Sequence, residues 1–336
     1  MSAKASPETG NTKVRLSAAE ATTTAEHALA RIGFSAQESQ VIAAHLVDAA
    51  LCGYTFAGLP RILTIAEDPR TRQKRTPVRI VKETPVSAMV DGGNYVGYYA
   101  VYRAAEISVQ KARGSGFALV GVHNCHLSGR NAYYLEMIAR AGFVGIHMAS
   151  APPIVVPMGG TSPGLGTNPI AIAVPRDPFP YIFDMGTAAI MRGEVILRSR
   201  TGEKLPDGVA IDSQGCPTTD PAEALLGGIL PFGGHKGYGL SCMIQAVCLL
   251  TGAALARGRV QDYGFLFIVF DPELLMPLGQ FKQQLETLLG LIKGTPCQPG
   301  VSEIRISSER AFAEREKRRT EGITLEKAVY EAIKAL

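Results

Sequence analysis

Two glycine-rich stretches dominate this chain: Gly164-Leu165-Gly166-Thr167-Asn168-Pro169 and Leu230-Pro231-Phe232-Gly233-Gly234-His235-Lys236-Gly237-Tyr238-Gly239. Glycine adopts positive φ readily and lets backbone N–H groups approach a ligand closely. In the second stretch, His235 and Lys236 add a proton donor and a cation to those groups, a combination typical of an anion cradle. Two cradles predict a cofactor that carries phosphate, although neither stretch matches a P-loop or a dinucleotide fingerprint.

The composition is that of a globular protein, with 336 residues of which 46% are hydrophobic and 19% charged. This length supports a large core and two domains. The net charge of +4 is mild. The basic run between Arg70 and Lys82 is interpreted as a solvated loop, or else as a cofactor phosphate site, so no nucleic acid partner is expected. No Cys-x-x-Cys pair occurs among the six cysteines, so no metal site is expected.

The location of the protein is predicted from its N-terminus and its longest apolar run. Residues 1–12 are polar and lack the apolar core of a signal peptide. The six cysteines are scattered, and together with the lack of a secretory signal this fits a reducing setting, so the cytoplasm is expected. The run from Leu240 to Ala256 is long enough for a short membrane span, but Gln245 and the flanking glycines favour a buried core helix.

Helices and strands alternate along much of the sequence, which predicts an α/β domain. Ser17 and Glu20 have capping-box spacing and predict the start of the first helix. Residues 1–14 are expected to be disordered and residues 198–220 to be turns. Helices are expected at 17–32, 36–52, 100–113, 131–141, 237–253, 278–293, 309–319 and 324–335, and strands at 78–81, 87–91, 117–122, 143–149, 170–174, 181–184 and 265–270.

Five blocks carry a family resemblance: Gly164–Pro169, Phe183–Thr187, Leu205–Gly208 with Asp212, Pro217–Pro221 and Leu230–Gly239. On these blocks the chain, from about Leu16 onward, resembles the type-2 malate/L-lactate dehydrogenase family, which includes sulfolactate and ureidoglycolate dehydrogenases and Δ1-piperideine-2-carboxylate (ketimine) reductases. The resemblance implies a non-Rossmann NAD(P)-binding α/β fold, a mixed sheet with flanking helices. It also implies a homodimer whose active sites lie in clefts between domains.

The expected domains are a helical substrate and dimer domain and a cofactor-binding α/β domain. The first comprises residues 15–75 and 298–336, and the second comprises residues 76–297.

The chain departs from the family pattern at the catalytic block. The family pattern Gly-x-x-Ser-His-Gly-x-x-Arg corresponds here to residues 53–61, with Phe56 and Ala57 in place of the serine and histidine. An alanine methyl group cannot transfer a proton, so the usual general acid is absent. Ser307-Ser308-Glu309 replaces a Pro-Gly-Glu, and the stretch from Ala256 to Gly264 is shorter than usual. These changes fall on the substrate side of the family's site.

Three residues are candidates for catalysis: Arg61, His126 and Asp184. Arg61 stands where the family clamps a substrate carboxylate, although it could be an ordinary surface arginine. His126 follows a buried strand and is either catalytic or a structural loop histidine. Asp184 either lines the cofactor or accepts hydrogen bonds from the following turn. Phe56 is expected to line the substrate pocket, and Arg130 either contacts an anion or pairs with Glu136.

The resemblance also implies a set of cofactor-binding residues and NADPH or NADH as the cofactor. Asn168 could instead be a turn former before Pro169. The expected set is Gly166, Thr167, Asn168, Pro169, Asp184, Met185, Gly186, Thr187, His235, Lys236 and Gly237.

Together these features predict an NAD(P)H-dependent reductase of a small carboxylate-bearing substrate, with an altered proton-donor site. A 2-oxo acid gains negative charge on oxygen and needs a donor there. A cyclic ketimine is often already protonated near neutral pH, so the loss of the histidine harms its reduction less. The alternative is a cofactor-binding protein, or a non-redox enzyme on the same scaffold, that has lost dehydrogenase chemistry.

Overall fold

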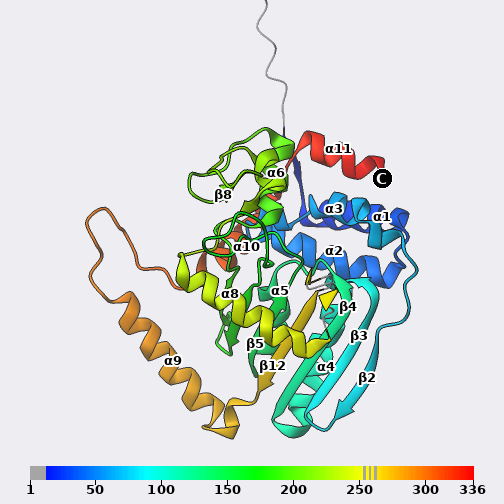
Figure 1. Cartoon of the computed structure of the whole chain (residues 1–336). Coiled ribbons are helices and arrows are strands. Elements are labelled where there is room, and N and C mark those ends of the chain that lie inside the picture. The colour runs from blue at the N-terminus through cyan, green and yellow to red at the C-terminus, as the bar shows by residue number, and fades with distance from the viewer. Residues whose placement is uncertain (1–12, 253–254, 257–258, 261–262) are drawn as a thin grey trace, which may run out of the picture. The chain divides into compact units, whose positions relative to one another are not determined.

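The computed structural model describes residues 13–252, 255–256, 259–260 and 263–336 (Figure 1). The chain divides into two compact units, Met1–Glu67 with Ala313–Leu336 and Asp68–Phe312. Most of the expected disordered segment lies outside the described residues, as does part of the stretch after the predicted core helix. Lys13 and Val14, expected to be disordered, lie in a strand.

The first unit is mainly helical. Ser17 and Ser35 each form a capping box, with Glu20 and Glu38 respectively, and this confirms the two predicted N-terminal helices. Gly33, at a φ of 104°, ends the first of them. The helices of this unit are α1 (Ala18–Ile32), α2 (Ala36–Leu51), α3 (Arg61–Glu67), α11 (Lys327–Ala335) and the greater part of α10 (Glu309–Glu321).

A small antiparallel pair joins the two ends of the chain. Strand β1 (Lys13–Leu16) pairs with β13 (Ile323–Glu326). The helix expected over 324–335 is therefore wrong at its start and begins at Lys327. Ile323 and Leu325 are buried while Thr324 is exposed, which is the alternation of a half-buried strand.

The second unit contains a seven-stranded mixed sheet, as predicted. Its order is β2-β3-β4-β12-β5-β6-β7. Strands β3 and β4 are parallel and are connected by α4 (Gly97–Ser115), whereas every other neighbouring pair in this sheet is antiparallel. The strands are β2 (Arg79–Thr84), β3 (Ser87–Val96), β4 (Phe117–His126), β5 (Val144–Ser150), β6 (Ile170–Val174), β7 (Tyr181–Met185) and β12 (Gly264–Phe270).

Helices cover both faces of this sheet (Figure 1). Helices α4 and α5 (Asn131–Arg140) pack on one face, and α8 (His235–Cys248) packs against β5 and β12 on the other. Helix α8 is shorter than predicted and only one of its faces is buried, since Met243 is 62% exposed. No helix among the described residues is long and apolar enough to cross a membrane.

The core beneath α5 contains an unusual histidine. His147 on β5 stacks on Phe267 with ring centroids 4.0 Å apart and meets the edge of Tyr134. Its Nδ1 lies 3.1 Å from the carbonyl oxygen of Leu266. Because burial disfavours the charged ring, the pKa of His147 falls from 6.5 to about 3.

A smaller apolar cluster lies beyond the sheet, around Val155, Val195 and Ile229. Short helices and strands cover this cluster. One of these helices lies where turns were expected. Residues 198–201, expected to be turns, complete helix α6 (Arg192–Thr201), which ends at Gly202 with a φ of 74°. The others are α7 (Pro221–Leu226), β8 (Ala210–Ile211) and β9 (Gly228–Ile229).

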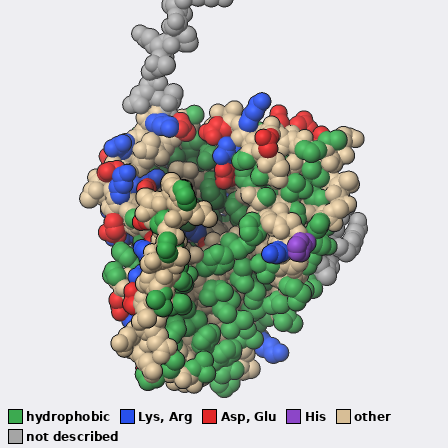
Figure 2. All heavy atoms as spheres, turned by 90° about the vertical axis from the view of Figure 1, so that its left-hand side faces the viewer, with side chains coloured by type: hydrophobic (Ala, Val, Ile, Leu, Met, Phe, Trp, Pro, Cys, Tyr) green, Lys and Arg blue, Asp and Glu red, His purple; other side chains and the backbone are tan. Residues whose placement is uncertain are grey.

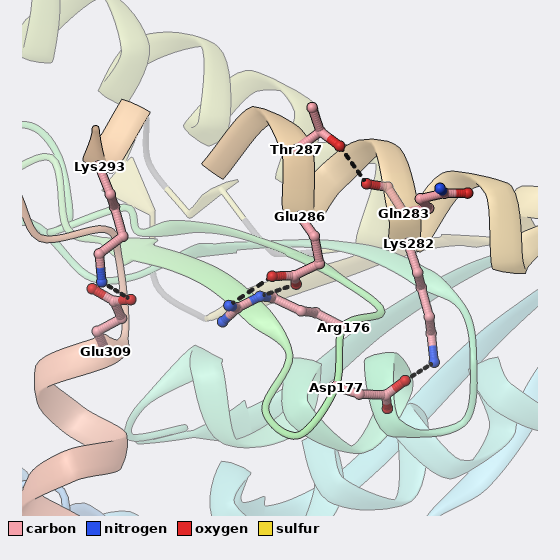
Figure 3. A network of polar contacts seen from close by, with 8 residues as sticks. All are labelled: Arg176, Asp177, Lys282, Gln283, Glu286, Thr287, Lys293 and Glu309. Carbon is pink, nitrogen blue, oxygen red and sulfur yellow. Dashed lines mark hydrogen bonds and ion pairs between the residues drawn. The ribbon is translucent and has the colours of Figure 1, made fainter. Parts of the chain in front are cut away.

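Helix α9 (Leu278–Lys293), as predicted, is held to its unit by charged contacts along one side (Figure 3). Lys282 Nζ lies 2.7 Å from Asp177 Oδ2, and Lys293 Nζ lies 2.7 Å from Glu309 Oε1. A further pair joins Arg176 to Glu286 through two hydrogen bonds. These pairs leave an apolar side of α9 uncovered.

Candidate functional site

Three of the blocks predicted to bind the cofactor are hydrogen-bonded to one another through Thr187. The buried Thr187 hydroxyl donates to the carbonyl oxygens of Thr167 and Asn168, at 3.1 and 3.2 Å. The carbonyl oxygen of Thr187 accepts from the N–H of Phe232 at 2.8 Å. The structure therefore brings together segments that are far apart in the sequence.

The side chain of Asn168 links the first block to α8. Its Nδ2 lies 3.1 Å from Ser241 Oγ and 2.8 Å from Gln245 Oε1, and its Oδ1 accepts from the N–H of Ala151 at 3.3 Å. The residue is fully buried and has a φ of 29°. The carboxamide of Asn168 is thus occupied by protein partners, and these hydrogen bonds fix the conformation of the loop.

Three glycines in these blocks lie very close to other atoms of the protein. A Cβ atom on Gly166 would lie 2.4 Å from the carbonyl oxygen of Ala151, and one on Gly237 would lie 1.8 Å from that of Phe232. A Cβ atom on Gly186 would lie 2.5 Å from the sulfur of Met191, a flexible side chain that can move. Gly166 and Gly237, which face main-chain oxygens, therefore admit no side chain even before a ligand binds.

The N-terminus of α8 is open and has the features of an anion site. Gly233 and Gly234 have φ values of 57° and 60°, and a Cβ atom on either would meet nothing within 4 Å. No side chain caps this helix, and His235 and Lys236 are exposed in its first turn. The first turn of a helix presents unpaired N–H groups and a partial positive charge, which suit a phosphate. This end of α8 fits the phosphate part of a dinucleotide.

Asp184, at the end of β7, is half-buried and accepts hydrogen bonds from the N-terminus of α5. The N–H of Ala132 donates to its Oδ2 at 2.8 Å, and the N–H of Asn131 also donates to it. Desolvation raises the pKa of Asp184, while these N–H groups and the charge of Arg130 partly offset that rise. The structure thus places Asp184 and Arg130 near each other.

His126 is buried at the end of β4 and precedes a tight turn. Leu127 and Gly129 have φ values of 57° and 73°, and a positive φ at a leucine is strained. The hydroxyl of buried Tyr134 donates to the carbonyl oxygen of Ser128 at 2.6 Å and so holds this turn. Strain of this kind is common at functional sites.

The candidates of the first unit lie around a short 3-10 helix, Thr55–Ala57. Phe56 is half-buried and Ala57 is buried. Arg61 is the first residue of α3, and no described residue pairs with its guanidinium, whose Nε is buried. A buried unpaired guanidinium nitrogen is costly unless a ligand binds it. A Cβ atom on Gly58 would lie 2.8 Å from that of Ala50, which fixes this block against α2.

Sequence reasoning missed three residues. Ser241 and Gln245 bind Asn168, and Asn131, whose main-chain N–H donates to Asp184, has a buried side chain. Gln245 could have been found from the sequence, because it is a polar residue within an apolar helix and such a residue needs a buried partner. The described residues contain no cluster of histidine, cysteine or carboxylate side chains that could hold a metal ion.

Comparisons with known proteins agree with this arrangement. A family profile described as malate/L-lactate dehydrogenase matches residues 16–334. The chain is 35% identical over 319 residues to the malate/(S)-sulfolactate dehydrogenase of Methanothermus fervidus, covering 91% of this chain and 92% of that one. It is 33% identical over 336 residues to the Δ1-pyrroline-2-carboxylate reductase of Ancylobacter novellus, covering 96% and 97%. The structure of the sulfolactate dehydrogenase from Methanocaldococcus jannaschii superposes with a TM-score of 0.81 at 33% identity, covering 96% of both chains.

The family profile and these relatives identify the chain as an NAD(P)-dependent oxidoreductase. The chain belongs to the malate/L-lactate dehydrogenase family, whose profile it matches over nearly its whole length.

Proposed function

We propose that this chain is an NAD(P)H-dependent reductase of a small carboxylate-bearing substrate, a cyclic ketimine or a 2-oxo acid, with an altered proton-donor site. The observation that carries the proposal is the joining of the cofactor blocks through Thr187 while Ala57 stands at the family's histidine position. The binding blocks are intact, and the altered residues lie at the family's proton-donor position.

On the cofactor side, the open N-terminus of α8 binds the phosphates, with Lys236 and His235 as cationic and donor groups. The loop Gly166–Pro169 and the segment Asp184–Thr187 support the rest of the nucleotide. When bound, NADH or NADPH supplies the hydride. The protein's contribution is to hold the nucleotide in one orientation.

On the substrate side, Arg61 binds the carboxylate group. Its guanidinium lacks a partner among the described residues, and a planar guanidinium can bind a carboxylate through two parallel hydrogen bonds. Phe56 provides an apolar wall where the family has a small polar residue. In the second unit, His126 and Arg130 flank the turn before α5 and remain candidates for contact with an acidic group.

The loss of the histidine favours a ketimine over a 2-oxo acid. Reduction of a protonated imine neutralises a positive charge, so Asp184 can stabilise the substrate by its negative charge. Reduction of a 2-oxo acid places negative charge on oxygen and needs a donor close by.

The test restores the family residues. Steady-state rates with a panel of cyclic ketimines and 2-oxo acids are compared between the wild type and the Phe56→Ser, Ala57→His variant. We expect the variant to lose activity on ketimines, because Phe56 no longer lines the pocket. A rise of about 10²–10⁴-fold on a 2-oxo acid would instead favour that substrate class. Nucleotide binding without turnover of any substrate would support the cofactor-binding alternative.

We further propose that the protein is a homodimer in the cytoplasm. Figure 2 shows apolar side chains over a broad face of the molecule. Exposed patches of this extent commonly mark an interface. All six cysteines are unpaired, which suits a reducing compartment. Large apolar side chains exposed on or beside α8 and α9 are Phe232, Met243, Leu249, Leu250, Leu288, Leu291 and Ile292.

Light scattering tests the dimer. The wild type should have twice the 35.7 kDa mass of one chain at micromolar concentration. Leu250→Asp and Leu291→Asp should each shift it toward the single-chain mass, because a charge is costly in an apolar interface. A wild type of 35.7 kDa would contradict the proposal.

A further inference from the structure

Asn131, the first residue of α5, has a buried side chain whose hydrogen-bonding groups are unused. Only 1% of the residue's surface is exposed, and no described residue provides a partner to its Nδ2 or its Oδ1. Native proteins rarely leave such groups unpaired, and an exception requires an explanation. The buried carboxamide of Asn168, by contrast, uses both its donor and its acceptor.

The surroundings of Asn131 restrict what can bind there. The main-chain N–H groups of Asn131 and Ala132 already donate to Asp184, so the N-terminus of α5 does not offer these groups to an anion. Asp184 and Arg130 carry opposite charges beside this point, so neither an anionic nor a cationic ligand group is strongly favoured there. The ligand group should therefore be neutral and should both accept and donate a hydrogen bond.

We propose that Asn131 binds the carboxamide group of the nicotinamide ring. Its Nδ2 donates to the oxygen of that group and its Oδ1 accepts from the nitrogen, so two primary amides pair through two hydrogen bonds. This inference rests on the proposed function, which places the cofactor along Asp184–Thr187. Pairing of this kind fixes the rotation of the carboxamide and helps to decide which face of the ring meets the substrate.

The test compares two nucleotides that differ at this group alone. Calorimetric titration uses NAD⁺ or NADP⁺, whichever binds more tightly, and its 3-acetylpyridine analogue, in which a methyl group replaces the amide nitrogen. The analogue keeps the acceptor and loses the donor. The wild type should bind the analogue about tenfold more weakly, because Oδ1 of Asn131 is then left buried without a donor.

Variants of Asn131 should abolish this discrimination. Asn131→Leu keeps the side-chain shape and Asn131→Ala removes it. Both variants should bind the natural nucleotide about tenfold more weakly than the wild type does. In each variant, the affinities for the natural nucleotide and for the analogue should differ by less than about threefold. Asn94→Gly serves as a control that should keep the wild-type ratio, because Asn94 has a φ of 62° and bonds only to Arg70 among the described side chains.

The outcomes separate this inference from the proposed function. A wild type that binds both nucleotides equally overturns the role of Asn131, even if no variant folds. Discrimination that persists in folded Asn131→Leu also overturns it. A wild type that binds neither nucleotide overturns the proposed function as well.

Discussion

Asn168 Nδ2 lies 2.8 Å from Gln245 Oε1, so one side chain joins the first glycine-rich loop to the middle of α8. The two residues are 77 positions apart in the sequence. Because Thr187 bonds to the same loop, the segments proposed to hold the cofactor are fixed before it binds. Such preorganisation lowers the entropic cost of binding.

Replacing Asn168 should therefore harm both stability and binding. Asn168→Ala leaves Gln245 and Ser241 without their buried partner, and the free energy of unfolding should fall by roughly 1–3 kcal/mol. Urea denaturation measures this change, with the exposed Gln284→Ala as a control. Wild-type stability in Asn168→Ala would show that the network contributes little.

Lys236 should matter for nucleotide binding and not for folding, because it is exposed at the open end of α8. Lys236→Ala should weaken NAD(P)H binding by roughly 1–3 kcal/mol, the contribution of a charge-assisted hydrogen bond. Lys82→Ala, in the basic run, is the matched control. If titration finds the effect at Lys82 instead, the phosphates bind to the basic run.

His147 should make the protein sensitive to mild acid. Its pKa is about 3 in the folded state and 6.5 ordinarily, so the unfolded chain binds the proton more readily between these values. Stability falls as pH decreases below 6.5, by about 1.4 kcal/mol per unit, or about 2 kcal/mol at pH 5. His147→Phe keeps the stacking on Phe267 and should remove this dependence. Parallel curves of unfolding free energy against pH for both proteins would refute the assignment.

The buried ion pair of the first unit should be important for stability. Arg315 Nη1 lies 3.0 Å from Asp48 Oδ1, and both side chains are largely buried. Asp48→Ala removes this carboxylate partner of a buried guanidinium and should lower the free energy of unfolding by about 3–5 kcal/mol. Glu321→Ala, which removes an exposed pair with Lys317, should change it by less than about 1 kcal/mol. Equal effects in the two variants would contradict this distinction.

Local signals predicted the longer helices and the strands of the large sheet, but the helices α3, α6 and α7 and the short strands β8 and β9 were not expected. The capping box of Ser17 and Glu20 lies within one turn, so its sequence spacing alone identifies the helix start. Strand β13 was missed because its partner, β1, lies about 300 residues away and residues 323–335 also fit a helix. The exposed side of α8 was missed for a related reason, since an apolar run does not show which of its faces is covered.

The candidate site was predictable only where glycine marks the backbone. Gly166, Gly186 and Gly237 identified the converging blocks, yet the structure shows that they accommodate neighbouring protein atoms. Asn131 could not be found in this way, because no short sequence motif indicates that its side chain is buried in the folded protein.

The ion pair of Asp48 with Arg315 connects residues 267 positions apart, and β1 pairs with β13 across an even longer separation. During synthesis the second unit, Asp68–Phe312, is completed while the first still lacks its C-terminal quarter. The unit that contains α1 and α2 therefore cannot complete its folding until the last residues have been translated. A ribosome that stops early releases a chain with a complete sheet and an exposed, unfinished helical unit, which is a form that chaperones and proteases recognise.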